Sequence, residues 1–214
     1  MARMNLDHAL ARLAGQLPLS GRQAALPDGH AAVHRAILQG FADRGRAPSL
    51  AELGESLADA EKIVQRLAED DLVVLADGNV VGAYPFSAEP TPHRITIDGR
   101  ATYAMCSLDA VAIAPVFERQ VEIESTCAST DKPIRIQQSS GVVVSADPPD
   151  LRLGVRWSEP DGCAAHSMCR EMVFLVDAET AERWRGSDPE SAGIFDLADA
   201  IEFGYRFFRP LVQG

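Results

Sequence analysis

The chain has 214 residues, of which 46% are hydrophobic and 24% are charged, a composition typical of a globular protein that buries a core. Its formal net charge of -11 at pH 7 disfavours nucleic acid or an anionic membrane as a partner, because both attract basic patches. The sequence has neither the apolar run of ~18 residues that spans a membrane nor the apolar stretch of a secretory signal. We therefore expect a cytoplasmic protein whose four cysteines are reduced thiols.

Residues 30–84 have the pattern of a small helical module. Apolar residues at helical spacing predict a helix over 30–45 that ends at a glycine. Ser49 and Glu52 have the spacing of a capping box, which predicts that a second helix begins there. A third helix is predicted over 59–71.

The module ends in a predicted β-hairpin over 72–85, with Asp77-Gly78 as its turn. Three helices and a two-stranded wing are the outline of a winged helix, which is often a DNA-binding unit. Residues 1–85 carry 8 basic and 11 acidic residues, however, and the third helix is itself acidic. Because phosphate would be repelled there, we expect this module to act as a scaffold or lid.

The pattern changes to strands after SAEPTPHR (87–94), which has the composition of a linker. Strands are predicted at 94–97, 121–126, 132–138, 141–146, 151–157 and 170–176. Helices are predicted at about 102–117, at 177–186 with Asp177 as its cap, and from 196 until Pro210 stops the last one. The expected fold is α+β, with a winged-helix-like module over 1–86 and a mixed or antiparallel sheet with flanking helices over 87–214.

Cys106 and Asp109 stand three residues apart in the hydrophobic segment YAMCSLDAVAIAPVF. On a helix they share a face, and a helix N-terminus favours thiolate over thiol. An aspartate in an apolar pocket has a raised pKa and can hold a proton near neutral pH. Taken alone, the pair is explained more simply by a core helix that buries a cysteine and bonds Asp109 to nearby backbone.

The remaining cysteines are Cys127, Cys163 and Cys169. Cys163, His166 and Cys169 invite a zinc interpretation, but the chain lacks the paired C-x2-4-C spacing of structural zinc sites. The sequence also lacks a G-x-S-x-G elbow, a P-loop and a dinucleotide-binding glycine pattern. Spacing alone therefore leaves the function open.

Four stretches occur in a specific order: YAMCSLDAVAIAPVF, VEIESTCASTDKPIRI, SMCREMVFLVDAETAERW and IFDLADAIEFGYRFF. In this order the chain resembles the organomercurial (alkylmercury) lyases of bacterial mercury resistance, over most of residues 80–208. The resemblance implies that Cys106, Asp109 and Cys169 are the catalytic and mercury-binding residues. It gives Cys127 a structural place and Cys163 no counterpart. Met105 and Arg170 depart from the family pattern, which puts pocket shape and substrate preference in question.

These residue types suit protonolysis of a carbon–mercury bond to RH and Hg²⁺. Mercury is soft and prefers thiolates, and a protonated carboxyl is a suitable donor to the leaving carbon. The reaction needs no cofactor, because no electrons change hands and Hg²⁺ is the bound product. The resemblance further implies low-molecular-weight thiols and mercuric reductase as partners. The competing interpretation is a non-catalytic protein of the same fold that binds or senses mercury, against which the retained Asp109 and the acidic third helix argue.

Overall fold

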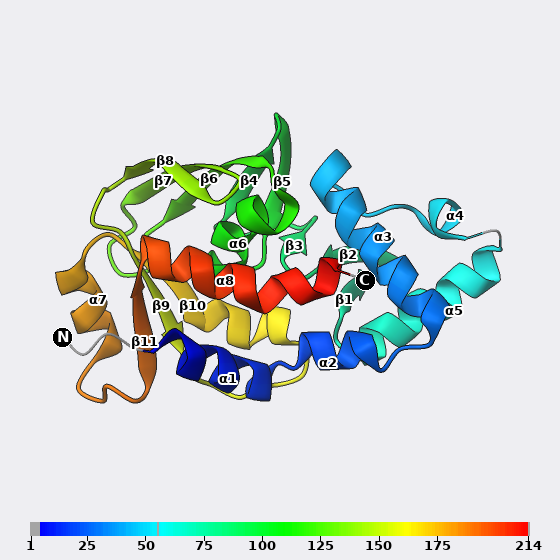
Figure 1. Ribbon diagram of the computed structural model, residues 1–214, viewed down its shortest axis with the longest axis horizontal. Coiled ribbons are helices and arrows are strands. Elements are labelled where there is room, and N and C mark those ends of the chain that lie inside the picture. Colours follow the sequence, from blue (N-terminus) through cyan, green and yellow to red (C-terminus); the bar gives the residue numbers. More distant parts are fainter. Residues whose placement is uncertain (1–4, 55, 214) are drawn as a thin grey trace.

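The computed structural model describes residues 5–54 and 56–213, which form an α+β fold (Figure 1). The helical N-terminal part contains α1 (Leu6–Gln16), α2 (Leu19–Ala24), α3 (Asp28–Arg44), α4 (Leu50–Leu53) and α5 (Leu57–Glu69). Glycine ends α3 as predicted, with Gly45 at φ 70, and Ser49 with Glu52 forms the predicted capping box of α4. Local sequence signals therefore place these helices.

Eight antiparallel strands form the larger sheet, in the order β1-β2-β3-β5-β4-β6-β7-β8. Their bounds are β1 Val73–Ala76, β2 Asn79–Ala83, β3 Phe86–Ser87, β4 Arg94–Ile97, β5 Arg100–Ala104, β6 Gln120–Thr126, β7 Pro133–Ser139 and β8 Val142–Asp147. The predicted hairpin with its Asp77-Gly78 turn is β1–β2, and it is continuous with the rest of this sheet. The stretch 87–94 connects β3 and β4 within it.

The elements that follow β8 in the chain include a second, smaller sheet. They are β9 (Arg152–Arg156), the 3-10 helices Ala164–His166 and Met168–Glu171, β10 (Met172–Leu175), α7 (Ala178–Arg185), β11 (Ala192–Asp196) and α8 (Leu197–Val212). Strands β10, β9 and β11 pair antiparallel in that order. The side chains of Asp177 and Asp196 cap α7 and α8.

The structure differs from the sequence prediction in several details. The helix expected from about Thr102 begins only at Ser107, because the positive-φ turn at Asp98-Gly99 sends residues 100–104 back along β4 as β5. Pro210 does not stop the last helix, which runs on to Val212 while Leu211 packs into the core. Strand β11 was not predicted.

Helix α6 (Ser107–Phe117) lies at the centre of the molecule, behind α8 in Figure 1. It is apolar on all sides, as expected of a helix that is covered all round, by α8 and by strands of both sheets. Among the described residues, no helix is both long and apolar enough to cross a membrane. The centre of the fold is thus a rigid buried helix, and its N-terminus carries the residues singled out from the sequence.

Gly204→Ala is expected to lower the free energy of unfolding by about 1–3 kcal/mol, the usual cost of overpacking. A Cβ at Gly204 of α8 would lie 2.8 Å from the Ala112 Cβ and 3.0 Å from the Leu108 carbonyl oxygen of α6, so the two helices would have to separate. Urea unfolding measures the change. The matched control is Gly15→Ala in α1, where a Cβ meets nothing within 4 Å and helix propensity should add roughly 0.5–1 kcal/mol. Equal effects of the two substitutions would contradict the close approach of α6 and α8.

Candidate functional site

Cys106 lies at the junction of β5 and α6, where it is the N-cap of the helix. Its backbone is extended, and its sulfur accepts a hydrogen bond from the Asp109 backbone N–H at 3.4 Å. The Cys106 thiol also contacts the Met172 sulfur at 3.6 Å. A cysteine replaces the usual hydroxyl or carboxylate of a helix cap here, so its sulfur is fixed by the first turn of the helix.

Asp109 occupies the first turn of α6 and is only 1% exposed. Its Oδ2 atom is buried and has no hydrogen-bond partner. Burial raises the pKa of Asp109 from 3.8 to about 7, and hydrogen bonding with Cys106 offsets only part of this rise. The predicted near-neutral proton on Asp109 is therefore supported, and the unpartnered oxygen is free to meet a ligand.

Cys169 comes from the other side of the site, 63 residues further along the chain. It lies on the 3-10 helix just before β10, and β10 packs against α6. Its side chain is 3% exposed. One ligand atom each from Cys106, Asp109 and Cys169 lie within 4.8 Å of one another, which makes this trio a candidate metal centre. The structure thus brings together the three residues that the sequence analysis selected.

Both thiols of this site have raised pKa values, which favours the protonated thiol at neutral pH. Burial raises the pKa of Cys106 well above its ordinary 9.0. Contact with Cys106 lowers the pKa of Cys169, but burial and the nearby Asp109 carboxyl outweigh it, so that pKa is raised too. The expectation that the helix N-terminus would favour a Cys106 thiolate is wrong, because removal from water outweighs the helix dipole.

A polar cluster anchors the segment that carries Cys169. The Tyr84 hydroxyl donates to the Asp71 carboxylate at 3.0 Å and accepts from the Ala165 N–H at 2.8 Å. Asp71 also accepts from the Ala164 N–H at 3.3 Å and pairs with Arg22 at 3.2 Å. No local pattern predicts this role, because Tyr84 resembles an ordinary hairpin residue and Asp71 is one of several acids at the end of the predicted third helix.

Cys163 and Cys127 lie outside the trio. Cys163 is half-buried, with its sulfur 3.7 Å from the Tyr84 hydroxyl. Cys127 is buried in the turn between β6 and β7, where its backbone bonds to Lys132 and Asp131. Within the described part of the chain, the zinc trio of Cys163, His166 and Cys169 does not converge as a metal-ligating group.

Asp109→Asn is expected to stabilise the protein more at pH 8 than at pH 5. The folded protein keeps the Asp109 proton up to about pH 7, whereas the ordinary carboxyl releases it near 3.8. Below pH 3.8 this proton contributes its full stabilisation, about 4 kcal/mol. That stabilisation is lost as the pH rises from 3.8 to about 7. Asn cannot ionise, so its advantage should grow by about 2–3 kcal/mol between the two pH values.

Urea unfolding of the two proteins at pH 5 and pH 8 measures this difference. Asp59→Asn, at the exposed first turn of α5, is the control and should show no such growth. If the gap between Asp109→Asn and wild type stays constant with pH, the buried carboxyl does not titrate near neutrality.

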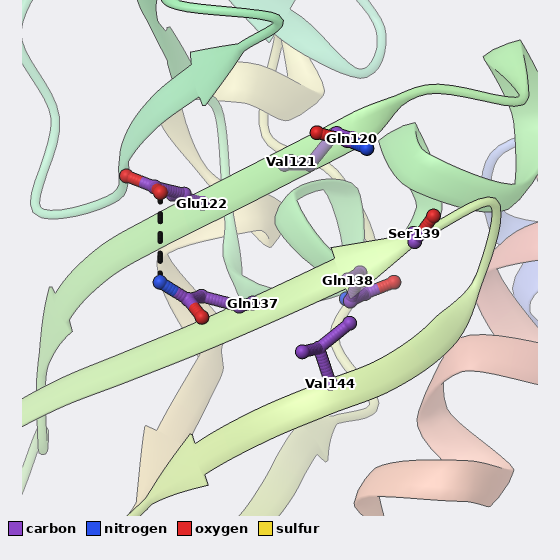
Figure 2. Close-up of a pocket in the computed structure, with 7 residues that line it drawn as sticks. All are labelled: Gln120, Val121, Glu122, Gln137, Gln138, Ser139 and Val144. Atoms are coloured by element: carbon purple, nitrogen blue, oxygen red, sulfur yellow. Dashed lines mark hydrogen bonds between the residues drawn. The ribbon is translucent and has the colours of Figure 1, made fainter.

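A separate hollow of about 220 Å³ lies on strands β6, β7 and β8 (Figure 2). Figure 2 shows the hydrogen bond between Gln137 and Glu122 at its edge, with Gln138 and Val144 beside it. It contains no thiol, imidazole or second acid. It therefore has none of the chemistry that the buried trio offers.

The chain is similar to known proteins of a single family. The family model described as alkylmercury lyase matches residues 86–209, which is more than half of the chain. This chain belongs to the alkylmercury lyase family. Within that family, the Staphylococcus epidermidis alkylmercury lyase is 30% identical over 154 residues, covering 72% of this chain and 69% of the relative. The Bacillus cereus alkylmercury lyase is 30% identical over 151 residues, with 71% and 67% covered.

The fold of this alkylmercury lyase family member also matches a solved structure. The mercury-bound form of MerB2 superposes with a TM-score of 0.76, covering 91% of this chain and 98% of that chain at 23% identity. That match confirms the α+β architecture. The family assignment makes the protein a lyase enzyme.

Proposed function

We propose that this enzyme cleaves the carbon–mercury bond of organomercurials by protonolysis, with Cys106 and Cys169 as mercury ligands and Asp109 as proton donor. The observation that carries the proposal is the convergence of two buried thiols and one buried carboxyl within 4.8 Å. Two soft sulfurs match mercury, and one hard acid matches the carbon that must be protonated.

The substrate enters as an organomercury–thiol adduct, R–Hg–SR′. Cys106 and Cys169 displace R′S⁻, which leaves as R′SH with one of the two cysteine protons. The ionised form of Asp109, which is present near its pKa of about 7, accepts the other proton and then gives it to the carbon, which leaves as RH. Hg²⁺ remains on the two cysteine sulfurs, so atoms and charge balance without oxidation or reduction.

The raised thiol pKa values support this order of events. Both cysteines hold their protons until a metal that binds thiolates displaces them. The site therefore carries the reaction's own protons into a space that excludes water. Asp109, with its pKa near 7, is suited both to accept and to release a proton at neutral pH.

The same chemistry indicates the cofactor requirement, the compartment and the partners of the enzyme. The reaction needs no cofactor, because the substrate supplies the metal and no electrons are transferred. We place the enzyme in the cytoplasm, where thiols stay reduced, and assign removal of Hg²⁺ to low-molecular-weight thiols and mercuric reductase.

We assign residues 1–86 to a winged-helix-like module that covers the catalytic part, residues 87–214. Tyr84 and Asp71 support this role, because they hold the segment that leads to Cys169. The acidic character of α5 opposes a role in DNA binding.

Hydrocarbon release tests the proposal. The purified enzyme is mixed with phenylmercury or methylmercury and excess thiol, and benzene or methane is measured by gas chromatography. We expect stoichiometric hydrocarbon and Hg²⁺. A mercury-binding or sensing protein would retain the organomercurial and release no hydrocarbon, and that result would overturn the assignment.

A further inference from the structure

A second hollow, of about 320 Å³, lies beside the buried trio. Met105, the residue before Cys106, forms part of its wall, and so does Arg170, the residue after Cys169. Glu89 also lines this hollow. Among the four hollows described by their lining residues, this one alone includes chain neighbours of both cysteines.

The reacting sulfurs cannot be reached directly, since Cys106 is 1% and Cys169 is 3% exposed. A thiol that delivers the organomercurial or removes Hg²⁺ must therefore approach through a neighbouring opening. The hollow is placed for this approach, because it touches the chain on either side of the sulfur pair. Its largest apolar wall residue, Met105, is 9% exposed and directly precedes Cys106 in the chain.

Two exposed side chains of opposite charge line the hollow. Arg170 and Glu89 are both exposed, and neither side chain has an ion pair or hydrogen bond with the described part of the chain. A guanidinium recognises a carboxylate through paired hydrogen bonds. A carboxylate in turn pairs with an ammonium group. The wall therefore offers one site for each half of a zwitterion.

We propose that this hollow binds the zwitterionic head group of an α-amino-acid thiol, free or bonded to the organomercurial. Arg170 receives the carboxylate and Glu89 receives the ammonium, and the thiol sulfur points toward Met105 and the buried pair. The inference rests on the proposed function and deepens it, because it names the chemical form in which the substrate arrives and the thiol that takes Hg²⁺ away.

Four thiols separate the two charges: cysteine carries both, 3-mercaptopropionate only the carboxylate, cysteamine only the ammonium, and 2-mercaptoethanol neither. Phenylmercury is supplied as each adduct, and kcat/KM is measured for wild type, Arg170→Gln and Glu89→Gln. For each thiol, the kcat/KM of a variant is divided by the kcat/KM of wild type, which cancels the intrinsic reactivity of that thiol.

Arg170→Gln should lower kcat/KM roughly two- to fivefold for cysteine and mercaptopropionate, about the value of one exposed ion pair, and leave the other two thiols unchanged. Glu89→Gln should do the same for cysteine and cysteamine. Arg135→Gln, at an exposed arginine of β7, is the control and should affect none. Equal losses for all four thiols, or none, would overturn the inference.

The same comparison is repeated on protein preloaded with Hg²⁺, by following the rate at which each thiol extracts the metal. This measurement does not require carbon–mercury cleavage. If no arm releases hydrocarbon but the rate of Hg²⁺ extraction depends on Arg170, the lyase activity is rejected and the thiol site is kept. Extraction independent of Arg170 and Glu89, with normal hydrocarbon release, would reject the site and keep the lyase.

Discussion

Asp109→Asn should abolish most hydrocarbon release while leaving the organomercurial bound. Asn has nearly the same shape as Asp and keeps the first turn of α6, but it has no proton to give to carbon. Loss of a positioned acid typically costs about 10²–10⁴ in rate. Benzene release from phenylmercury gives the rate, and mercury retained after gel filtration gives the binding.

The control is again Asp59→Asn, an aspartate in the first turn of α5 that is exposed and distant from the trio in sequence. It should turn over at the wild-type rate. Normal turnover by Asp109→Asn would remove Asp109 from the proton path. Loss of both binding and turnover would instead mean that the carboxylate is needed to hold the metal.

Cys106→Ser and Cys169→Ser should each reduce turnover by at least about 10³-fold, because a hydroxyl is a hard and poor ligand for mercury. The two variants should differ in stability. Serine is a good helix N-cap, so Cys106→Ser is expected to keep α6 and the fold intact while it removes a metal ligand. Unfolding curves measured beside hydrocarbon release separate loss of chemistry from loss of structure.

Cys163→Ser and Cys127→Ser are the matched controls for these variants. Cys163 is half-buried outside the trio, so its replacement should leave hydrocarbon release within about twofold, a change of less than 0.5 kcal/mol. Cys127 is fully buried, and serine there should lower stability without a specific loss of turnover. Normal activity in both Cys106→Ser and Cys169→Ser would disprove the site.

Local patterns predicted the elements whose causes are local. The helix stop at Gly45, the capping box at Ser49 and the Asp77-Gly78 hairpin are each decided within a few residues, and the structure confirms them. Residues 102–104 (Thr-Tyr-Ala) were misassigned because they lead directly into the apolar segment that forms α6. The decisive signal was the Asp98-Gly99 turn, which pairs β5 with β4.

Local sequence patterns predicted less of the candidate site than of the fold. The spacing of Cys106 and Asp109 predicted their shared turn, but only the family resemblance joined Cys169 to them across 63 residues. The raised thiol pKa values depend on complete burial, which a sequence pattern does not show. Tyr84 and Asp71 act through tertiary hydrogen bonds to a distant segment, and neither carries a local signature.

The two sulfurs of the trio stand on supports of unequal stiffness. Cys106 caps a central helix that is packed on all sides, whereas Cys169 lies on short 3-10 turns that are buried in the core and also bonded to Tyr84 and Asp71. Segments with fewer backbone ladders open more readily than core helices. For the mechanism proposed above, we expect the distance between the sulfurs to adjust on the Cys169 side, so that the pair fits a bulky organomercurial and then closes on the smaller bare ion.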